Sequence, residues 1–400
     1  MKRICLSVVG LFLTLFAAFS QNTDTSQYKS RKLNFEEANL VSSYYHQDGN
    51  NSAVTGGIGS EKLTDFSNTI DIKLSKWGKY NRKHNFDIEL GIDHYTSASS
   101  DKIDPRTISS ASSADTRIYP SINWAVENAK KGTTIGAGIS SSSEFDYQSF
   151  GANVNFAQKT RNKNGEFSAK LQAYIDNLKY IMPIELRSTG TSGGREHENS
   201  YPLKSRNSFS GSLAYSQIIS KRLQIMFLVD GIYQQGYLGL PFHRVYFNDN
   251  TVHVENLPNT RTKLPLGFRA NYFLGDKLIV RSFYRYYKDD WGLKSNTVDL
   301  EASVKLTPFL SVTPFYRYYT QTAVNYFKPY GMHTAADQYY TSNYDLAAFN
   351  SQFYGAGFRI APPNGVFGAQ HLSMLEVRFG HYAKTTGMNA NILSLNLKFK

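Results

Sequence analysis

The chain has 400 residues, a formal net charge of +12, 28 tyrosines, 26 phenylalanines and one cysteine, Cys5. After residue 20 no apolar run exceeds the seven-residue stretch LQIMFLV, so the sequence excludes a bundle of membrane-spanning helices, each of which needs about 20 apolar residues. If Cys5 is removed with an N-terminal leader, disulfide bonds and thiolate metal sites are excluded as well.

Residues 1–20 have the pattern of a secretory signal peptide. Lys2 and Arg3 precede the apolar stretch ICLSVVGLFLTLFAAF, and Ala18-Phe19-Ser20 offers small residues at a cleavage site. A membrane anchor is the alternative, but the apolar stretch is shorter than the ~20 residues of a spanning helix. We therefore predict a cleaved signal over 1–20 and a polar periplasmic lead over 21–36.

From residue 37 onward the dominant pattern is alternation of apolar and polar residues. Examples are FDIELGID (86–93), TVDLEASVKL (297–306) and the final NILSLNLKF (391–399). Alternation with period two predicts strands, and segments of ten or more residues match the ~9–11 residues of a tilted membrane-spanning strand. Sixteen such strands are predicted, at 37–46, 66–75, 83–97, 113–127, 132–144, 146–157, 166–178, 206–219, 222–237, 262–273, 277–288, 295–306, 309–322, 351–360, 371–381 and 389–399.

The predicted connections alternate between short and long. Short turns are expected at ENAKKG, KTRNKNG, SKR, GDK and TP, whereas long connections are expected at 47–65, 98–112, 179–205, 238–261 and 323–350. An even number of strands with short periplasmic turns and long extracellular loops is typical of outer-membrane barrels. The turn at SEF (143–145) is short where an outer loop is expected.

The fold class predicted for 37–400 is therefore all-β, a transmembrane antiparallel up-and-down β-barrel of about 16 strands. A soluble β-sandwich or a β-helix would also tolerate alternation, but the sequence shows neither a linker between domains nor a short repeat.

The sequence FYRYY occurs twice, at 283–287 and at 315–319. The two copies lie two predicted strands apart and would run in the same direction. The alternate tyrosines Tyr284, Tyr286, Tyr316 and Tyr318 are expected on the lipid side, in an interfacial girdle. Chance similarity in a tyrosine-rich chain is the alternative.

The stretch NLVSSYYHQDGNNSAVTGGIGSEKLTDFSNTIDIKL (39–74) and the ending LNLKFK resemble domain of unknown function family 3570. The resemblance implies an outer-membrane β-barrel of a Gram-negative bacterium, no assigned activity, and a loose link to extracytoplasmic redox chemistry. Assembly machinery of the outer membrane is the partner expected for the C-terminal strand. Lys400 after Phe399 departs from the commonest form, in which the aromatic residue is last.

The polar sides of the predicted strands supply candidate pore-lining residues. Later strands contribute arginines and earlier ones contribute acids: Arg269, Arg281, Arg285, Arg317, Arg359, Arg378, and Asp71, Asp87, Glu89, Asp93. Charges of opposite sign on separate walls would set up a transverse field that orients dipolar solutes. Alternatively, the arginines pair with Asp299, Glu301 and Glu376 on neighbouring strands and only hydrate the interior.

The loop over residues 46–62 is a second candidate, because it is rich in residues that tolerate positive φ. It could form a constriction, bind a ligand or cation, or act as a structural cluster of turns, which we favour. It fails the calcium-loop template, and it lacks the Gly-Lys-Ser/Thr order of a phosphate loop. Its candidate residues are Asp48, Asn50, Asn51, Gly56, Gly57 and Gly59.

No nucleophile elbow and no histidines at metal-ligand spacing are present, so we expect no catalytic residue, no metal and no cofactor. The basic turns could contact anionic lipid or an acidic periplasmic protein, and export argues against nucleic acid. We predict an outer-membrane, porin-like passive or gated channel for small hydrophilic solutes, in contact with lipid and lipopolysaccharide. A closed-lumen scaffold for periplasmic partners is the alternative, and an enzyme carried on loops is the third.

Overall fold

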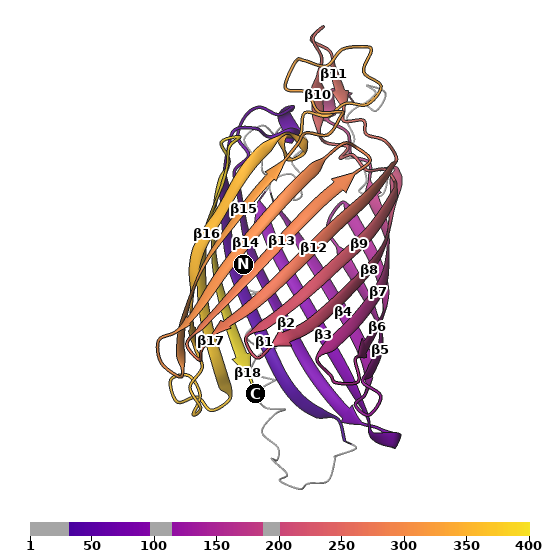
Figure 1. Cartoon of the computed structure of the whole chain (residues 1–400). Coiled ribbons are helices and arrows are strands. Elements are labelled where there is room, and N and C mark those ends of the chain that lie inside the picture. Colours follow the sequence, from indigo (N-terminus) through magenta and orange to yellow (C-terminus); the bar gives the residue numbers. More distant parts are fainter. Residues whose placement is uncertain (1–31, 97–113, 187–200) are drawn as a thin grey trace.

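The computed structural model describes residues 32–96, 114–186 and 201–400, so the predicted signal peptide and most of the lead lie outside the described residues. Sixteen antiparallel strands form a closed barrel, in which the last strand pairs with the first (Figure 1). The predicted fold class is confirmed.

All sixteen predicted strands are present, with boundaries that differ by a few residues. The first begins at Asn34, inside the segment assigned to the lead. The strands are β1 Asn34–Asp48, β2 Leu63–Trp77, β3 Arg82–Thr96, β4 Ala114–Asn128, β5 Thr133–Ser143, β6 Tyr147–Lys159, β7 Gly165–Lys179, β8 Leu203–Ser220, β9 Leu223–Gly236, β12 Thr260–Leu274, β13 Leu278–Asp289, β14 Lys294–Lys305, β15 Leu310–Gln321, β16 Phe349–Ile360, β17 Leu372–Lys384 and β18 Asn389–Phe399.

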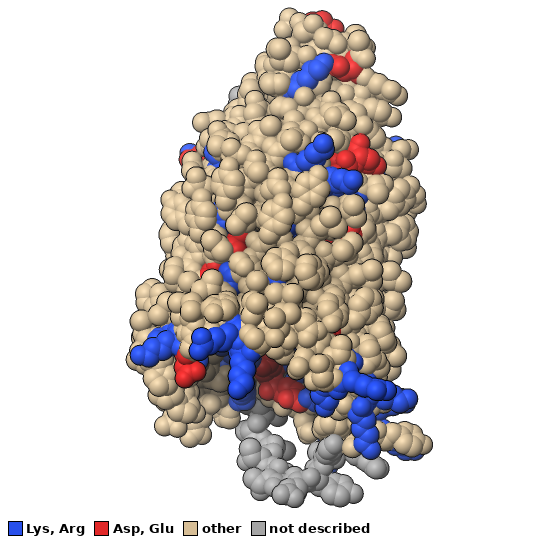
Figure 2. Space-filling model, viewed as in Figure 1, with Lys and Arg blue, Asp and Glu red and all other residues tan. Residues whose placement is uncertain are grey.

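Alternation places an apolar belt on the outer face of the barrel. In β14, Val298 and Leu300 are 40% and 46% exposed and point outward, while Asp299 and Glu301 point inward. Figure 2 shows the result as a broad, largely uncharged band, with Lys and Arg gathered along its lower edge. Tyr284, Tyr286, Tyr316 and Tyr318 of the FYRYY repeats lie on the outer parity, as predicted, and Tyr284 and Tyr316 are exposed there. The last tyrosine of each repeat, Tyr287 and Tyr319, lies on the inner parity.

The connections follow the predicted alternation with exceptions. The outer connection at 144–146 is indeed short, and so are two others that alternation alone would make long, at 290–293 and 385–388. At the opposite end, residues 361–371 form a connection longer than the other periplasmic turns. Among the described residues, no helix has the length and apolarity needed to cross a membrane.

Two long outer loops, 237–259 and 322–348, fold together above the barrel, and we call this pair the outer cap. Within it β10 (Arg244–Tyr246) and β11 (Val252–Val254) form a two-stranded sheet, visible at the top of Figure 1. The cap has its own core, in which Val245 and Thr341 are completely buried and His333 is nearly so. The β10–β11 hairpin was not predicted.

Candidate functional site: the barrel lumen

The register places every predicted pore-lining charge on the inner parity of its strand. Arg317 lies opposite Asp299, and Arg281 lies opposite Glu301. Arg359 is paired in register with Glu376, and Asp71 with Glu89. Alternate residues of a strand face opposite sides of the sheet. The inner parity therefore also includes the other predicted charges, at Arg269, Arg285, Arg378, Asp87 and Asp93.

These charges are distributed unevenly around the lumen. The acidic face consists of Asp71, Asp87, Glu89 and Asp93, all on β2 and β3. In the ring of sixteen strands, β2 is separated from β12 by half the circumference, and so is β3 from β13. The acidic face therefore lies across the lumen from Arg269, Arg281 and Arg285 on β12 and β13.

Three arginines are paired with acids on adjacent or nearby strands. Arg317 Nη2 lies 2.5 Å from Asp299 Oδ2. Glu301 is shared, because Arg281 Nη1 lies 2.5 Å from its Oε1 and Arg378 Nη2 lies 3.0 Å from its Oε2. For these three side chains the structure agrees with the alternative interpretation of local pairing, so their charges are partly neutralised within one wall.

Arg269 and Arg285 are placed differently, because both lie beside the ring of Phe283. Their guanidinium carbons lie 5.4 and 5.6 Å from the centre of the Phe283 ring, within the range of cation–π attraction. The closest ion-pair distance of Arg285 is 4.0 Å, to Asp230 Oδ2. This arginine–phenylalanine cluster thus keeps more of its positive charge available to the lumen than the tightly paired arginines do.

Sequence reasoning missed the aromatic residues of the inner wall. Phe283 and Phe315 lie on the same parity as the arginines, and Arg378 sits 4.1 Å from the centre of the Phe315 ring. Phe353 contacts Phe315, with ring centres 5.0 Å apart. The signal was present in the FYRYY repeats, since outward tyrosines in each copy imply an inward phenylalanine.

Two carboxylates of the acidic face, Asp71 and Asp93, are held by hydrogen bonds from neighbouring side chains. Asp71 accepts from Asn39 Nδ2 at 3.0 Å, and Lys73 Nζ lies 3.6 Å away. Asp93 accepts from Ser67 at 2.5 Å and from Tyr119 at 3.0 Å. These partners fix the carboxylates in place without neutralising all of them.

The inner charges remain in contact with solvent although the barrel is closed. The side chains of Arg281, Arg285 and Arg317 are 44%, 45% and 50% exposed. An ionised side chain removed from water without full pairing costs several kcal/mol. We conclude that the lumen beside these arginines has room for water.

The loop over 46–62 is a network of turns that supports the outer cap. The backbone N of Gly57 donates to Ser52 O at 2.8 Å, and the glycines at 56, 57 and 59 all have positive φ, near 80° to 87°. A Cβ on Gly57 would lie 2.6 Å from Ser342 O of the cap, so only glycine fits there.

The polar members of this loop also make structural contacts. Asn51 Nδ2 donates to Thr386 O at 2.6 Å, and Asp48 lies 3.8 Å from Lys62 Nζ. Asn50 is exposed. The favoured interpretation, a structural cluster of turns, accounts for these contacts.

Three carboxylates gather at the outer end of β4–β6, where Asp115, Glu144 and Asp146 place oxygens within 4.8 Å of one another. Tyr95 donates to Glu144 at 2.7 Å, and the backbone N of Phe145 donates to Asp115 at 3.2 Å. Burial, followed by the neighbouring carboxylates, raises the pKa of Asp146. We assign this group a structural role, because Asp115 and Glu144 already accept hydrogen bonds from the protein.

The chain belongs to the family described as protein of unknown function (DUF3570), whose model matches residues 80–389. The barrel is thus of a family without an assigned activity, as the resemblance implied. No curated protein matches the chain.

Several solved structures are similar to this chain. OccK2 (OpdF) of Pseudomonas aeruginosa shares 10% identity over 93% of this chain and 99% of its own, with a TM-score of 0.41. A BenF-like porin from Pseudomonas fluorescens Pf-5 shares 9% identity over 93% of this chain and 100% of its own, with a TM-score of 0.42. CdiB from Acinetobacter baumannii shares 10% identity over 93% of this chain and 66% of its own, with a TM-score of 0.47.

Proposed function

We propose that the protein is a porin-like channel of the outer membrane that passes small hydrophilic solutes through its lumen. The observation that carries the proposal is the half-exposed state of Arg281, Arg285 and Arg317 inside a closed barrel. A hydrated path lined by ordered charge is what diffusion of polar solutes requires.

The two charged faces suggest how such a channel selects. The acidic face on β2 and β3 opposes the arginine–phenylalanine cluster on β12 and β13. A solute with separated charges would align across this field, while simple ions would sense the net charge on each wall. The outer cap stands above the outer end of the barrel in Figure 1, a position that fits a gated channel.

The test is single-channel recording of the refolded mature barrel in a planar bilayer under a KCl gradient. Arg269→Glu and Arg285→Glu are the informative variants, because neither residue is held in a short ion pair with any residue that the structure describes. Arg222→Glu, on the turn between β8 and β9, makes the same change of charge away from the lumen.

We expect steady conductance, a shift toward cation selectivity in both lumen variants, and little shift in the control. Absence of conductance from correctly folded protein would contradict the channel and favour the closed-lumen scaffold. Equal shifts in all three variants would remove the arginine–phenylalanine cluster from the conduction path.

A further inference from the structure

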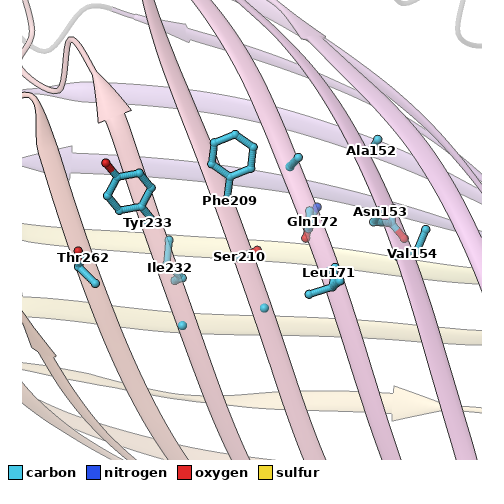
Figure 3. Close-up of a pocket in the computed structure, with 13 residues that line it drawn as sticks. Ala152, Asn153, Val154, Leu171, Gln172, Phe209, Ser210, Ile232, Tyr233 and Thr262 are labelled. Atoms are coloured by element: carbon cyan, nitrogen blue, oxygen red, sulfur yellow. The ribbon is translucent and has the colours of Figure 1, made fainter.

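A groove crosses the lipid-facing wall over β4–β9. It consists of two hollows of about 660 and 820 Å³ that share Val154 and Leu171 and therefore join. Figure 3 shows the outer hollow, with Phe209 and Tyr233 on one side and Leu171 and Val154 on the other. The second hollow continues from there to the periplasmic edge of the barrel, at Arg82 and Lys131.

The groove exists because small residues occupy outward positions that carry large side chains elsewhere on the belt. Gly211 lies opposite Gly231 in register, and Ala152 lies opposite Ala173. Nearer the periplasm, Ala137 is opposite Trp124 and Ala169 is opposite Phe156. The aromatic rings beside these positions form the sides of the groove, and the lining of its outer hollow is almost entirely apolar.

The periplasmic end of the groove is cationic. Arg82 begins β3, and Lys131 lies in the turn between β4 and β5. Among the ion pairs of residues 32–96, 114–186 and 201–400, neither cation takes part, whereas nearby Lys83 and Lys159 pair with Glu36 and Glu127. Two cations without a carboxylate partner thus stand where the apolar wall meets the periplasmic headgroups.

Trp124 marks the same boundary. It is 45% exposed, stacks on His84 with ring centres 5.9 Å apart, and lines the groove above Arg82 and Lys131. Indole rings prefer the level of the lipid headgroups, with the polar edge toward water. The cations therefore lie at phosphate depth and the alanines at acyl-chain depth.

We propose that this groove binds a phospholipid of the periplasmic leaflet whose headgroup carries a net negative charge, such as a phosphatidylglycerol. Arg82 and Lys131 hold the phosphate, and an acyl chain lies along the alanines toward Leu171. A juxtamembrane cation contributes about 1 kcal/mol to the binding of an anionic lipid surface. A second copy of the chain is disfavoured as occupant, because it would desolvate both cations without a known carboxylate partner.

Trp124 allows a direct test by quenching with brominated lipid. Trp77→Phe removes the tryptophan at the end of β2, and Trp291 lies in the core beneath the outer cap, away from acyl chains. Vesicles contain phosphatidylcholine and phosphatidylglycerol, with either one or the other dibrominated. The ratio of quenching gives the local preference of the groove for the anionic lipid.

We expect a preference of at least about fivefold, the factor that corresponds to one cation at about 1 kcal/mol. Arg82→Gln with Lys131→Gln should reduce it to about one, as expected if these cations hold the phosphate. Lys221→Gln with Arg222→Gln removes the same charge from another turn and should leave it unchanged. Ala137→Leu with Ala169→Leu fills the groove, keeps both cations, and should also lower the preference.

Any of four results would overturn the proposal. The preference could be absent in the parent protein, or it could fall equally in the control pair, which would indicate diffuse attraction to the basic rim. It could persist when the groove is filled, which would separate the headgroup effect from the groove. Shielding of Trp124 from both brominated lipids would identify a second copy as the occupant. All of these outcomes are independent of whether the lumen conducts.

Discussion

Asp337 in the outer cap shows how single side chains hold the long loops. Its carboxylate accepts from Lys328 Nζ at 2.6 Å and from the backbone N of Thr334 at 2.9 Å, and His333 Nδ1 lies 3.4 Å away. The bond from Lys328, followed by that from Thr334, lowers the pKa of Asp337 to about 2. A carboxylate with a lowered pKa stabilises the folded loop above its unfolded pKa of about 3.9, and this contribution is lost as the pH falls toward 2.

We therefore predict that the chemical shift of the Thr334 amide, followed by NMR in a micelle-refolded barrel, changes with pH with a midpoint of about 2. Asp337→Asn should abolish the transition. A midpoint close to 4 would show that Lys328 does not hold this carboxylate in solution. Asp249→Asn, at an exposed turn of the same cap, serves as the control and should leave the Thr334 titration unchanged.

At the scale of the element, the outer cap depends on a buried polar junction between its two loops. Thr341 is fully buried, and its hydroxyl donates to Glu255 at 2.5 Å. Glu255 also accepts from the backbone N of Leu240 at 2.9 Å, and Thr341 O lies 3.0 Å from His333 Nε2. Burial alone would raise the pKa of Glu255, but His243 and these donors lower it, so the carboxylate is ionised and needs its partners.

Thr341→Val keeps the shape of the side chain and removes the donor to Glu255. Loss of a hydrogen bond to a buried charged group costs about 1.5–3 kcal/mol. We predict faster hydrogen exchange in 237–259 and 322–348, with unchanged exchange in the barrel strands. Thr251→Val, at an exposed position of the same cap, should have little effect. Equal acceleration in the barrel would mean that cap and barrel unfold as one unit.

The strands and the cap differ in how far they could be predicted. Long strands such as β8 repeat their apolar alternation many times, and the belt requires that pattern, so their positions could be inferred from local sequence. The β10–β11 hairpin has three residues per strand, too few for a period. Its position is fixed by distant contacts, such as the bridge between Phe247 and His333.

In the lumen too, local sequence indicated some features and not others. Alternation placed the candidate charges on one parity of each strand, which is the inner parity of the register, but it could not identify their partners. Arg281 and Arg378 meet at Glu301, although 77 residues separate Arg378 from Glu301 in the chain. The stacking of Arg269 and Arg285 on Phe283 likewise depends on the register between β12 and β13, which residue types do not specify.

At the scale of the whole molecule, the fold inverts the usual arrangement, with apolar residues outside and charges inside. Leu213 points outward and is 50% exposed, and the adjacent Ser212 faces Asp230 and Lys170 in register. Leu213→Arg should destabilise the barrel by about 2–4 kcal/mol, because a guanidinium is forced into the hydrocarbon. Ser212→Arg should cost much less, since it enters a hydrated wall beside Asp230.

Urea unfolding in phospholipid vesicles, followed by tryptophan fluorescence, measures both changes. The two positions are adjacent on one strand and receive the same substituent, so the difference in unfolding free energy reports the side of the wall that receives the guanidinium. Equal losses of unfolding free energy would contradict the assignment of the two faces.

The pairing of β1 with β18 joins the two ends of the barrel domain edge to edge. Ala38 lies opposite Phe399 at the periplasmic rim, and the register continues to Asp48 opposite Asn389. Every other pair of neighbouring strands is also joined through a turn or loop of the chain, whereas this pair is held by its ladder and by contacts such as Lys398 with Glu37. The architecture therefore does not depend on where the chain begins and ends. A circular permutant, linked from Phe399 to Asn34 and opened at a periplasmic turn, would form the same closed barrel with its termini at that turn.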